Sequence, residues 1–138
     1  MRKIRFEFGS IALEAELLQT PTANAIWNKL PIHAEALRWG EEVYFEVPVA
    51  AKRESGARAV VERGEIAYWP DGNSIAIGFG RTPISEPGEI RLASPCNIWA
   101  KAIGDVRSLH PVPAGTPVTF QRCKSQLADR TSFRRNRR

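Results

Sequence analysis

Two short apolar segments flank the tetrapeptide Pro70-Asp71-Gly72-Asn73. Residues 64–69 read GEIAYW and residues 74–80 read SIAIGFG, which are lengths typical of strands. The tetrapeptide supplies the fixed φ of proline, side-chain hydrogen bonding from Asp and Asn, and the positive φ that glycine tolerates. The sequence therefore predicts a β-hairpin over residues 64–80.

The same pattern of short alternating runs and turn residues recurs along the chain. Residues 4–8 and 11–17 alternate with period two on either side of Gly9-Ser10, which predicts another hairpin. Further strands are expected at residues 90–92, 96–103 and 112–120, whereas residues 57–61 fit either a strand or a helix.

A third hairpin is predicted around Gly40, between residues 32–39 and 42–49. In its second strand Val43 and Phe45 share one face, and the other face carries Glu42, Tyr44 and Glu46. The apolar face belongs to the core, and the second face is open to either solvent or a pocket.

One segment changes to a helical period, with apolar residues at Ala23, Ile26, Trp27 and Leu30. Thr20 can cap the first free amides, Pro21 suits the first helical position, and Pro31 prevents continuation. The pattern predicts one short amphipathic helix, with Trp27 buried as a plug at an open end of the strands.

Many short strands with only one clear helix favour a mainly β barrel or sandwich. A chain of 138 residues with 43% hydrophobic residues suits one domain. Its apolar runs are far shorter than a membrane span, and residues 1–7 lack the apolar stretch of a secretory signal. We therefore expect a cytoplasmic protein with no membrane partner.

The net charge of +5 is concentrated at the end of the chain. Residues 1–120 carry 13 Lys/Arg and 14 Asp/Glu, whereas residues 121–138 carry seven and one. We expect a domain over 1–120 and a basic, disordered tail over 121–138 whose deletion leaves folding intact. Nucleic acid is expected as a partner only through this tail.

Motifs that carry chemistry are few. Cys96 and Cys123 lack metal-ligand spacing, and His33 and His110 are isolated in sequence, so we expect no metal and no cofactor. The chain contains no phosphate loop, no dinucleotide fingerprint and no nucleophile elbow. The sequence therefore assigns no catalytic residue.

Three segments, in this order, carry a resemblance to a known family: residues 21–27 (PTANAIW), 38–48 (RWGEEVYFEVP) and 64–73 (GEIAYWPDGN), the last followed by a strand ending in Gly78-Phe79-Gly80. Together they resemble the small prokaryotic cyclophilin-like family over about residues 2–110. The resemblance implies a closed cyclophilin-like β-barrel with one or two short capping helices.

The parent cyclophilins are peptidyl-prolyl cis-trans isomerases. Arg38 stands ahead of an aromatic strand as their arginine does, but Val43 and Glu46 replace the phenylalanine and glutamine of the isomerase motif. Residues 75–77 (IAI) likewise replace a Gln-Phe-Phe strand. Glu46 could pair with Arg38 and occupy the donor that polarises the prolyl amide. The resemblance therefore implies weak isomerase activity or none.

The leading interpretation is a binding domain that holds a peptide or small molecule in a shallow groove. The candidate ligand-binding residues are Arg38, Tyr44, Glu46, Tyr68, Asn73 and Phe79. Each also fits a structural role, such as a surface ion pair for Arg38 or core packing for either Tyr68 or Trp69. The alternatives are a weakly active prolyl isomerase and a nucleic-acid-associated protein that acts through its tail. The oligomeric state is open.

Overall fold

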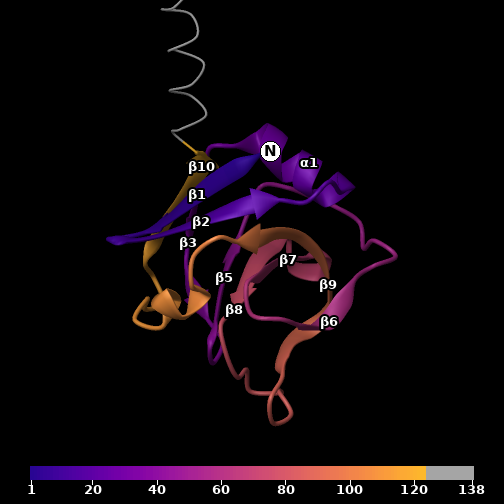
Figure 1. Ribbon diagram of the computed structural model, residues 1–138, viewed down its shortest axis with the longest axis vertical. Coiled ribbons are helices and arrows are strands. Elements are labelled where there is room, and N and C mark those ends of the chain that lie inside the picture. Colours follow the sequence, from indigo (N-terminus) through magenta and orange to yellow (C-terminus); the bar gives the residue numbers. More distant parts are fainter. Residues whose placement is uncertain (124–138) are drawn as a thin grey trace, which may run out of the picture.

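The computed structural model describes residues 1–123, which form ten strands, one α-helix and two short 3₁₀ helices (Figure 1). In chain order these are β1 (Lys3–Phe8), β2 (Ile11–Leu17), α1 (Pro21–Lys29), β3 (Ile32–Glu35), β4 (Leu37–Arg38), β5 (Glu42–Glu46), β6 (Arg58–Val61), β7 (Glu65–Trp69), η1 (Pro70–Gly72), β8 (Ser74–Gly78), β9 (Ile90–Ala102), η2 (Val106–Leu109) and β10 (Pro117–Arg122).

Nine strands form one antiparallel path in the order β3-β10-β1-β2-β9-β7-β8-β5-β4, and β6 pairs with β9 beside it. The two end strands, β3 and β4, are separated in the chain only by Ala36. The N–H of Ala36 donates to Thr116 O at 2.8 Å, and the carbonyl oxygen of Ala36 accepts from the N–H of Gly115 at 2.8 Å. The chain itself thus joins the two edges of the sheet, and the fold is the nearly closed, mainly β barrel that the sequence predicted.

Two of the predicted hairpins are confirmed in full. Phe8 pairs with Ile11 across the turn between β1 and β2. Trp69 pairs with Ser74 across η1, where Asn73 takes a left-handed conformation with φ of 48°. Local turn chemistry thus sets the register of both hairpins.

Two strand predictions need correction, and one segment that the sequence left open is a strand. The two pieces expected at 90–92 and 96–103 form one long strand, β9, because a bulge in its pairing with β6 accommodates Pro95. Of residues 57–61, which the sequence left open, Arg58–Val61 form β6. In the Gly40 hairpin only β4 pairs with β5, since β3 pairs with β10.

The last strand extends beyond the domain boundary expected after residue 120. Strand β10 continues to Arg122, and the N–H of Cys123 donates to Lys3 O at 2.9 Å. The barrel therefore includes residues 121–123. The rest of the expected disordered tail, 124–138, lies outside the described residues.

Helix α1 begins and ends where the sequence predicted. The Thr20 hydroxyl accepts a hydrogen bond from Ala23 N at 3.1 Å, and the helix ends at Lys29, two residues before Pro31. None of the helices that residues 1–123 form is long and apolar enough to cross a membrane.

The contact of α1 with the core differs from the prediction. Ile26 is fully buried, whereas Trp27 is only partly buried and packs at the edge of the core. The guanidinium of Arg122 lies 4.3 Å from the centre of a Trp27 ring, and that of Arg2 lies 5.7 Å away. Ile26 is therefore the large side chain of α1 that is buried in the core. Trp27 lies at the edge of the core and is not a plug.

The interior of the barrel is aromatic. The Phe6 ring lies 4.9 Å from Phe120, 6.1 Å from Phe45 and 6.4 Å from Trp99 between ring centres. Each such pair adds about 0.5 to 1.5 kcal/mol beyond the burial of its surface. Because side chains alternate along a strand, Val43 and Phe45 of β5 point inward as predicted.

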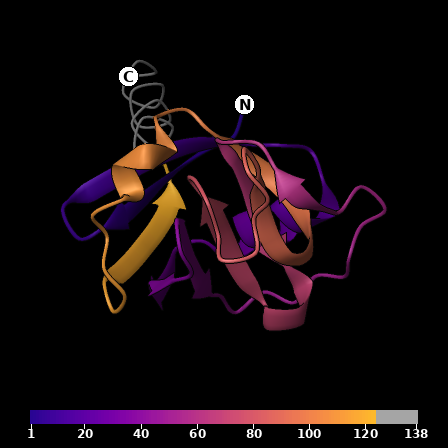
Figure 2. The same cartoon turned by 90° about the horizontal axis from the view of Figure 1, so that it is seen from below.

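A second, smaller apolar cluster lies on the outer face of the sheet, and we call it the outer cluster. It consists of Val61, Ala67, Ala76, Ile90, Leu92 and Cys96. Strands β7 and β8 contribute to both clusters because alternate residues face opposite sides, and Tyr44 of β5 packs against the outer cluster. Figure 2 shows β6 on the opposite side of the molecule from η2 and β10.

Candidate functional site

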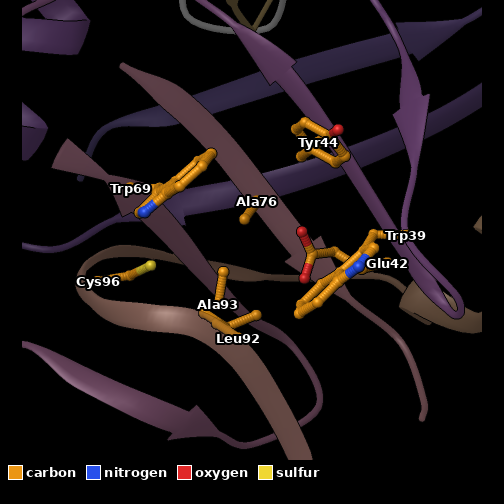
Figure 3. A pocket seen from close by; sticks show the side chains of 8 residues that line it. All are labelled: Trp39, Glu42, Tyr44, Trp69, Ala76, Leu92, Ala93 and Cys96. Carbon is orange, nitrogen blue, oxygen red and sulfur yellow. The ribbon is translucent and has the colours of Figure 1, made fainter. Parts of the chain in front are cut away.

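A pocket opens on the outer face of the barrel, against the outer cluster, and we call it the outer-face pocket. It encloses about 270 Å³. The lining side chains, shown in Figure 3, are Trp39, Glu42, Tyr44, Trp69, Ala76, Leu92, Ala93 and Cys96.

Small residues on β7 and β8 explain why there is a hollow at this place. Ala76 pairs with Tyr44 of β5 on one side and with Ala67 of β7 on the other. An alanine side chain leaves the floor of the pocket low between the Tyr44 and Trp69 rings (Figure 3). The next residue on the same face of β8 is Gly78, where an added Cβ would lie 2.5 Å from Ile90. This face of the sheet thus holds small side chains under large ones.

A tight turn places Trp39 and Glu42 side by side. The N–H of Trp39 donates to Glu42 O at 3.0 Å. Between them Gly40 has φ of 61°, and an added Cβ would lie 2.9 Å from Arg81 O, so only glycine fits there. The N–H of Glu41 also donates to Arg81 O, at 2.9 Å. The turn is therefore anchored on the neighbouring loop.

Trp69 is held in a fixed orientation on the other side of the pocket. Its indole N–H donates to the Ser94 hydroxyl at 2.8 Å. The ring also packs against the turn that follows it, because a Cβ on Gly72 would lie 2.5 Å from the indole. The Trp69 ring is thus positioned by the fold before any ligand arrives.

Glu42 is the charged group of the pocket. It is only 6% exposed, and its Oε1 has no hydrogen-bond partner within residues 1–123. In Figure 3 its carboxyl group points into the space between Ala76 and Ala93. Burial disfavours the charged form and raises the pKa of Glu42 from 4.5 to about 7. The carboxyl is an isolated acid in an apolar pocket.

Cys96 is the other group with acid chemistry whose pKa is perturbed here. Burial, and then the charge of Glu42, raise the pKa of its thiol to about 12. Its Sγ donates to Ser94 O at 3.2 Å. Because the thiolate is the reactive form of cysteine, this thiol is inert at neutral pH. Within residues 1–123 no three His, Cys, Asp or Glu side chains gather in a way that could hold a metal ion.

The residues predicted from sequence lie in four different places. Tyr44 lines the outer-face pocket. Arg38 lies beside Phe79 at 5.2 Å from the ring centre, and Glu46 is exposed at the end of β5. The remaining two are hydrogen-bonded to each other, because the Tyr68 hydroxyl donates to Asn73 Oδ1 at 3.0 Å.

Arg38 and Tyr68 make structural contacts. The Arg38 guanidinium donates to the carbonyl oxygens of Gly40, His110 and Val112, in place of the ion pair with Glu46 that the sequence suggested. Tyr68 is fully buried and bonds Val49 O through its hydroxyl. The structure thus gathers the six candidates into two structural groups, one pocket residue and one exposed carboxylate.

Sequence reasoning did not select most of the pocket residues. Glu42 had a signal, because it shares the outer face of its strand with Tyr44. Trp69 had one as well, because it alternates with the core residue Tyr68. Leu92, Ala93 and Cys96 had no such signal. They lie in the first half of β9, and only long-range strand pairing brings them to the pocket.

Comparison with known proteins agrees with the fold. The sequence model of the family described as Cyclophilin-like matches residues 2–121, and this chain belongs to that family. No curated protein sequence matches the chain.

Two solved structures share the fold. The solution structure of the hypothetical protein AF2241 from Archaeoglobus fulgidus is 38% identical, with a TM-score of 0.77 over 88% of this chain and 95% of that one. The structure of McbB in complex with tryptophan is 15% identical, with a TM-score of 0.64 over 86% of this chain and 44% of that one. The second similarity is one of fold.

Proposed function

We propose that this protein is a binding domain for a small molecule with an apolar or aromatic portion, held in the outer-face pocket. The observation that carries the proposal is the buried, unpartnered Oε1 of Glu42 inside a pocket lined by three aromatic rings. Leaving a buried polar atom unpaired costs about 1 to 3 kcal/mol. A ligand that supplies the missing donor recovers this free energy on binding.

The size of the pocket supports a compact ligand. Its volume of about 270 Å³ lies just below the usual range of small-molecule sites, about 300 to 1,000 Å³. Such sites are mainly apolar and hold a few well-placed polar groups, as this one does. An extended peptide needs a longer groove, so the pocket favours a small molecule over a peptide.

Binding is also favoured over prolyl isomerisation by the state of Arg38. The isomerases use an arginine donor near the prolyl amide, and here that guanidinium already donates to carbonyl oxygens of its own chain. Freeing it would break charge-assisted hydrogen bonds, which are stronger than ordinary ones.

The test is a ligand panel applied to the full chain and to a variant with a filled pocket. The panel contains tryptophan, which is bound in the McbB structure, together with small aromatic amines, alcohols and carboxylates. Ala76→Leu places a larger side chain on the pocket floor, and Ala12→Leu adds the same group at an exposed site on β2. Binding is measured by calorimetry, and cooperative unfolding of each variant is checked first.

At least one compound should bind the parent and Ala12→Leu but not Ala76→Leu. A panel compound that binds all three proteins with equal affinity would place the binding site elsewhere and would contradict the proposal.

A further inference from the structure

We infer that the outer-face pocket selects a ligand that carries a protonated amine on a compact apolar group, with the ammonium paired to Glu42. This inference rests on the proposed binding function and adds the chemical class of the ligand. It depends on the charge of the pocket, the nature of its rings and the pairing of the surrounding cations.

The carboxylate of Glu42 needs a cation from outside the chain. No lysine or arginine is among the side chains that line the pocket within residues 1–123. Two arginines on adjacent strands are engaged with other carboxylates, Arg58 with Glu65 at 2.7 Å and Arg91 with Glu89 at 2.7 Å. Arg38 of β4 is engaged with carbonyl oxygens of its own chain. A buried carboxylate without a cationic partner is costly, so an incoming ammonium group has a strong electrostatic advantage.

The rings around the carboxyl favour a cation as well. Aromatic faces carry partial negative charge and attract ammonium groups, with tryptophan the most effective. Trp39, Tyr44 and Trp69 all line the pocket that Glu42 enters (Figure 3). Carboxylate and rings therefore act in the same direction, toward a cation and against an anion.

The rest of the pocket wall is apolar, and it determines what the ligand carries besides its ammonium group. Ala76, Leu92 and Ala93 are apolar, and the Cys96 thiol stays neutral because burial raises its pKa. The titratable groups that share the pocket with Glu42 are Tyr44 from β5 and Cys96 from β9. Within the pocket one ionisable carboxyl thus faces an apolar wall, which matches an amine with a hydrophobic body.

The experiment uses three probes that share one phenyl group and differ in charge. These are 2-phenylethylamine, 2-phenylethanol and phenylacetate, measured by calorimetry at about pH 8, where Glu42 is ionised. The proteins are the parent chain, Glu42→Gln, and Glu46→Gln as a control for an exposed carboxylate on the same strand.

The amine should bind the parent about tenfold more tightly than the alcohol, and phenylacetate should bind most weakly. Glu42→Gln should abolish this preference while the alcohol still binds, which shows that the pocket remains intact. Glu46→Gln should behave as the parent does. At about pH 5 the preference of the parent should also fall, because protonation of Glu42 removes the charge.

Each other result has a defined meaning. If the three probes bind equally and Ala76→Leu abolishes all binding, the binding function stands and the cation preference is wrong. If phenylacetate binds best, Glu42 acts as a neutral donor and the inference is overturned. If none of the three binds the parent, the inference is overturned too, whatever the wider panel shows about binding.

Discussion

Replacement of Glu42 by glutamine should change how the stability of the protein depends on pH. Glu42 is only 6% exposed, and its Oε1 lacks a hydrogen-bond partner within residues 1–123. Its ionisation in the folded state therefore has to occur without the hydration that the unfolded chain offers. Glutamine keeps the shape of the side chain and removes the titration.

The magnitude follows from the two pKa values. Burial raises the pKa of Glu42 from 4.5 to about 7. Because the folded pKa is higher than the unfolded one, the folded state binds more protons between these values, so stability falls as the pH rises from 4.5 to about 7. At about 1.4 kcal/mol for each pH unit, the loss amounts to about 3 kcal/mol.

Urea denaturation of the parent and Glu42→Gln at about pH 4.5 and pH 8 measures this effect as a difference in the free energy of unfolding. The parent should lose about 3 kcal/mol relative to Glu42→Gln between the two conditions. Other titrating groups cancel in the comparison. Glu46→Gln, which changes an exposed carboxylate of the same strand, should keep the pH dependence of the parent. A difference between parent and Glu42→Gln that does not vary with pH would mean that the carboxyl is hydrated or partnered, and would refute the reasoning.

Three further predictions follow from the fold. A chain that ends at residue 120 should unfold at a lower temperature than one that ends at residue 123, because it loses the last two residues of β10 and the hydrogen bond from Cys123 N–H to Lys3 O. Equal melting temperatures would contradict this. Ile26→Ala should cost about 2 to 5 kcal/mol in denaturation, more than Trp27→Ala, and the reverse order would restore Trp27 as the plug. A tetrapeptide assay should show little or no prolyl isomerisation, since Arg38 is engaged by backbone carbonyls; a robust rate that Arg38→Ala removes would disprove this.

Local features of the fold were predictable from sequence. The hairpin turns depend on residues such as Gly9 and Asn73, whose backbone preferences act over four residues. The helix could be placed because Thr20 and Pro31 mark its two ends. The family resemblance added the barrel closure, which no local pattern determines.

The site was less accessible to sequence reasoning, because long-range pairing builds it. Leu92 and Cys96 reach the pocket through the bulged strand β9, which the sequence divided into two pieces at Pro95. The low floor depends on Ala76, and an alanine in a strand carries no functional signal of its own. The alternation that places Glu42 and Tyr44 on the same face of β5 was visible in the sequence. Burial of that face, however, depends on strands that lie far away in the chain.

The four tryptophans provide the most direct measurement of where a ligand binds. Trp39 and Trp69 line the outer-face pocket, whereas Trp27 lies on α1 and Trp99 lies in the barrel core. Each indole N–H gives its own signal in a proton–nitrogen correlation spectrum. During titration with the tightest-binding panel compound, the Trp39 and Trp69 signals should move saturably while those of Trp27 and Trp99 stay in place. Movement confined to Trp27 or Trp99, with Trp39 and Trp69 unchanged at saturation, would contradict the assignment of the outer-face pocket as the binding site.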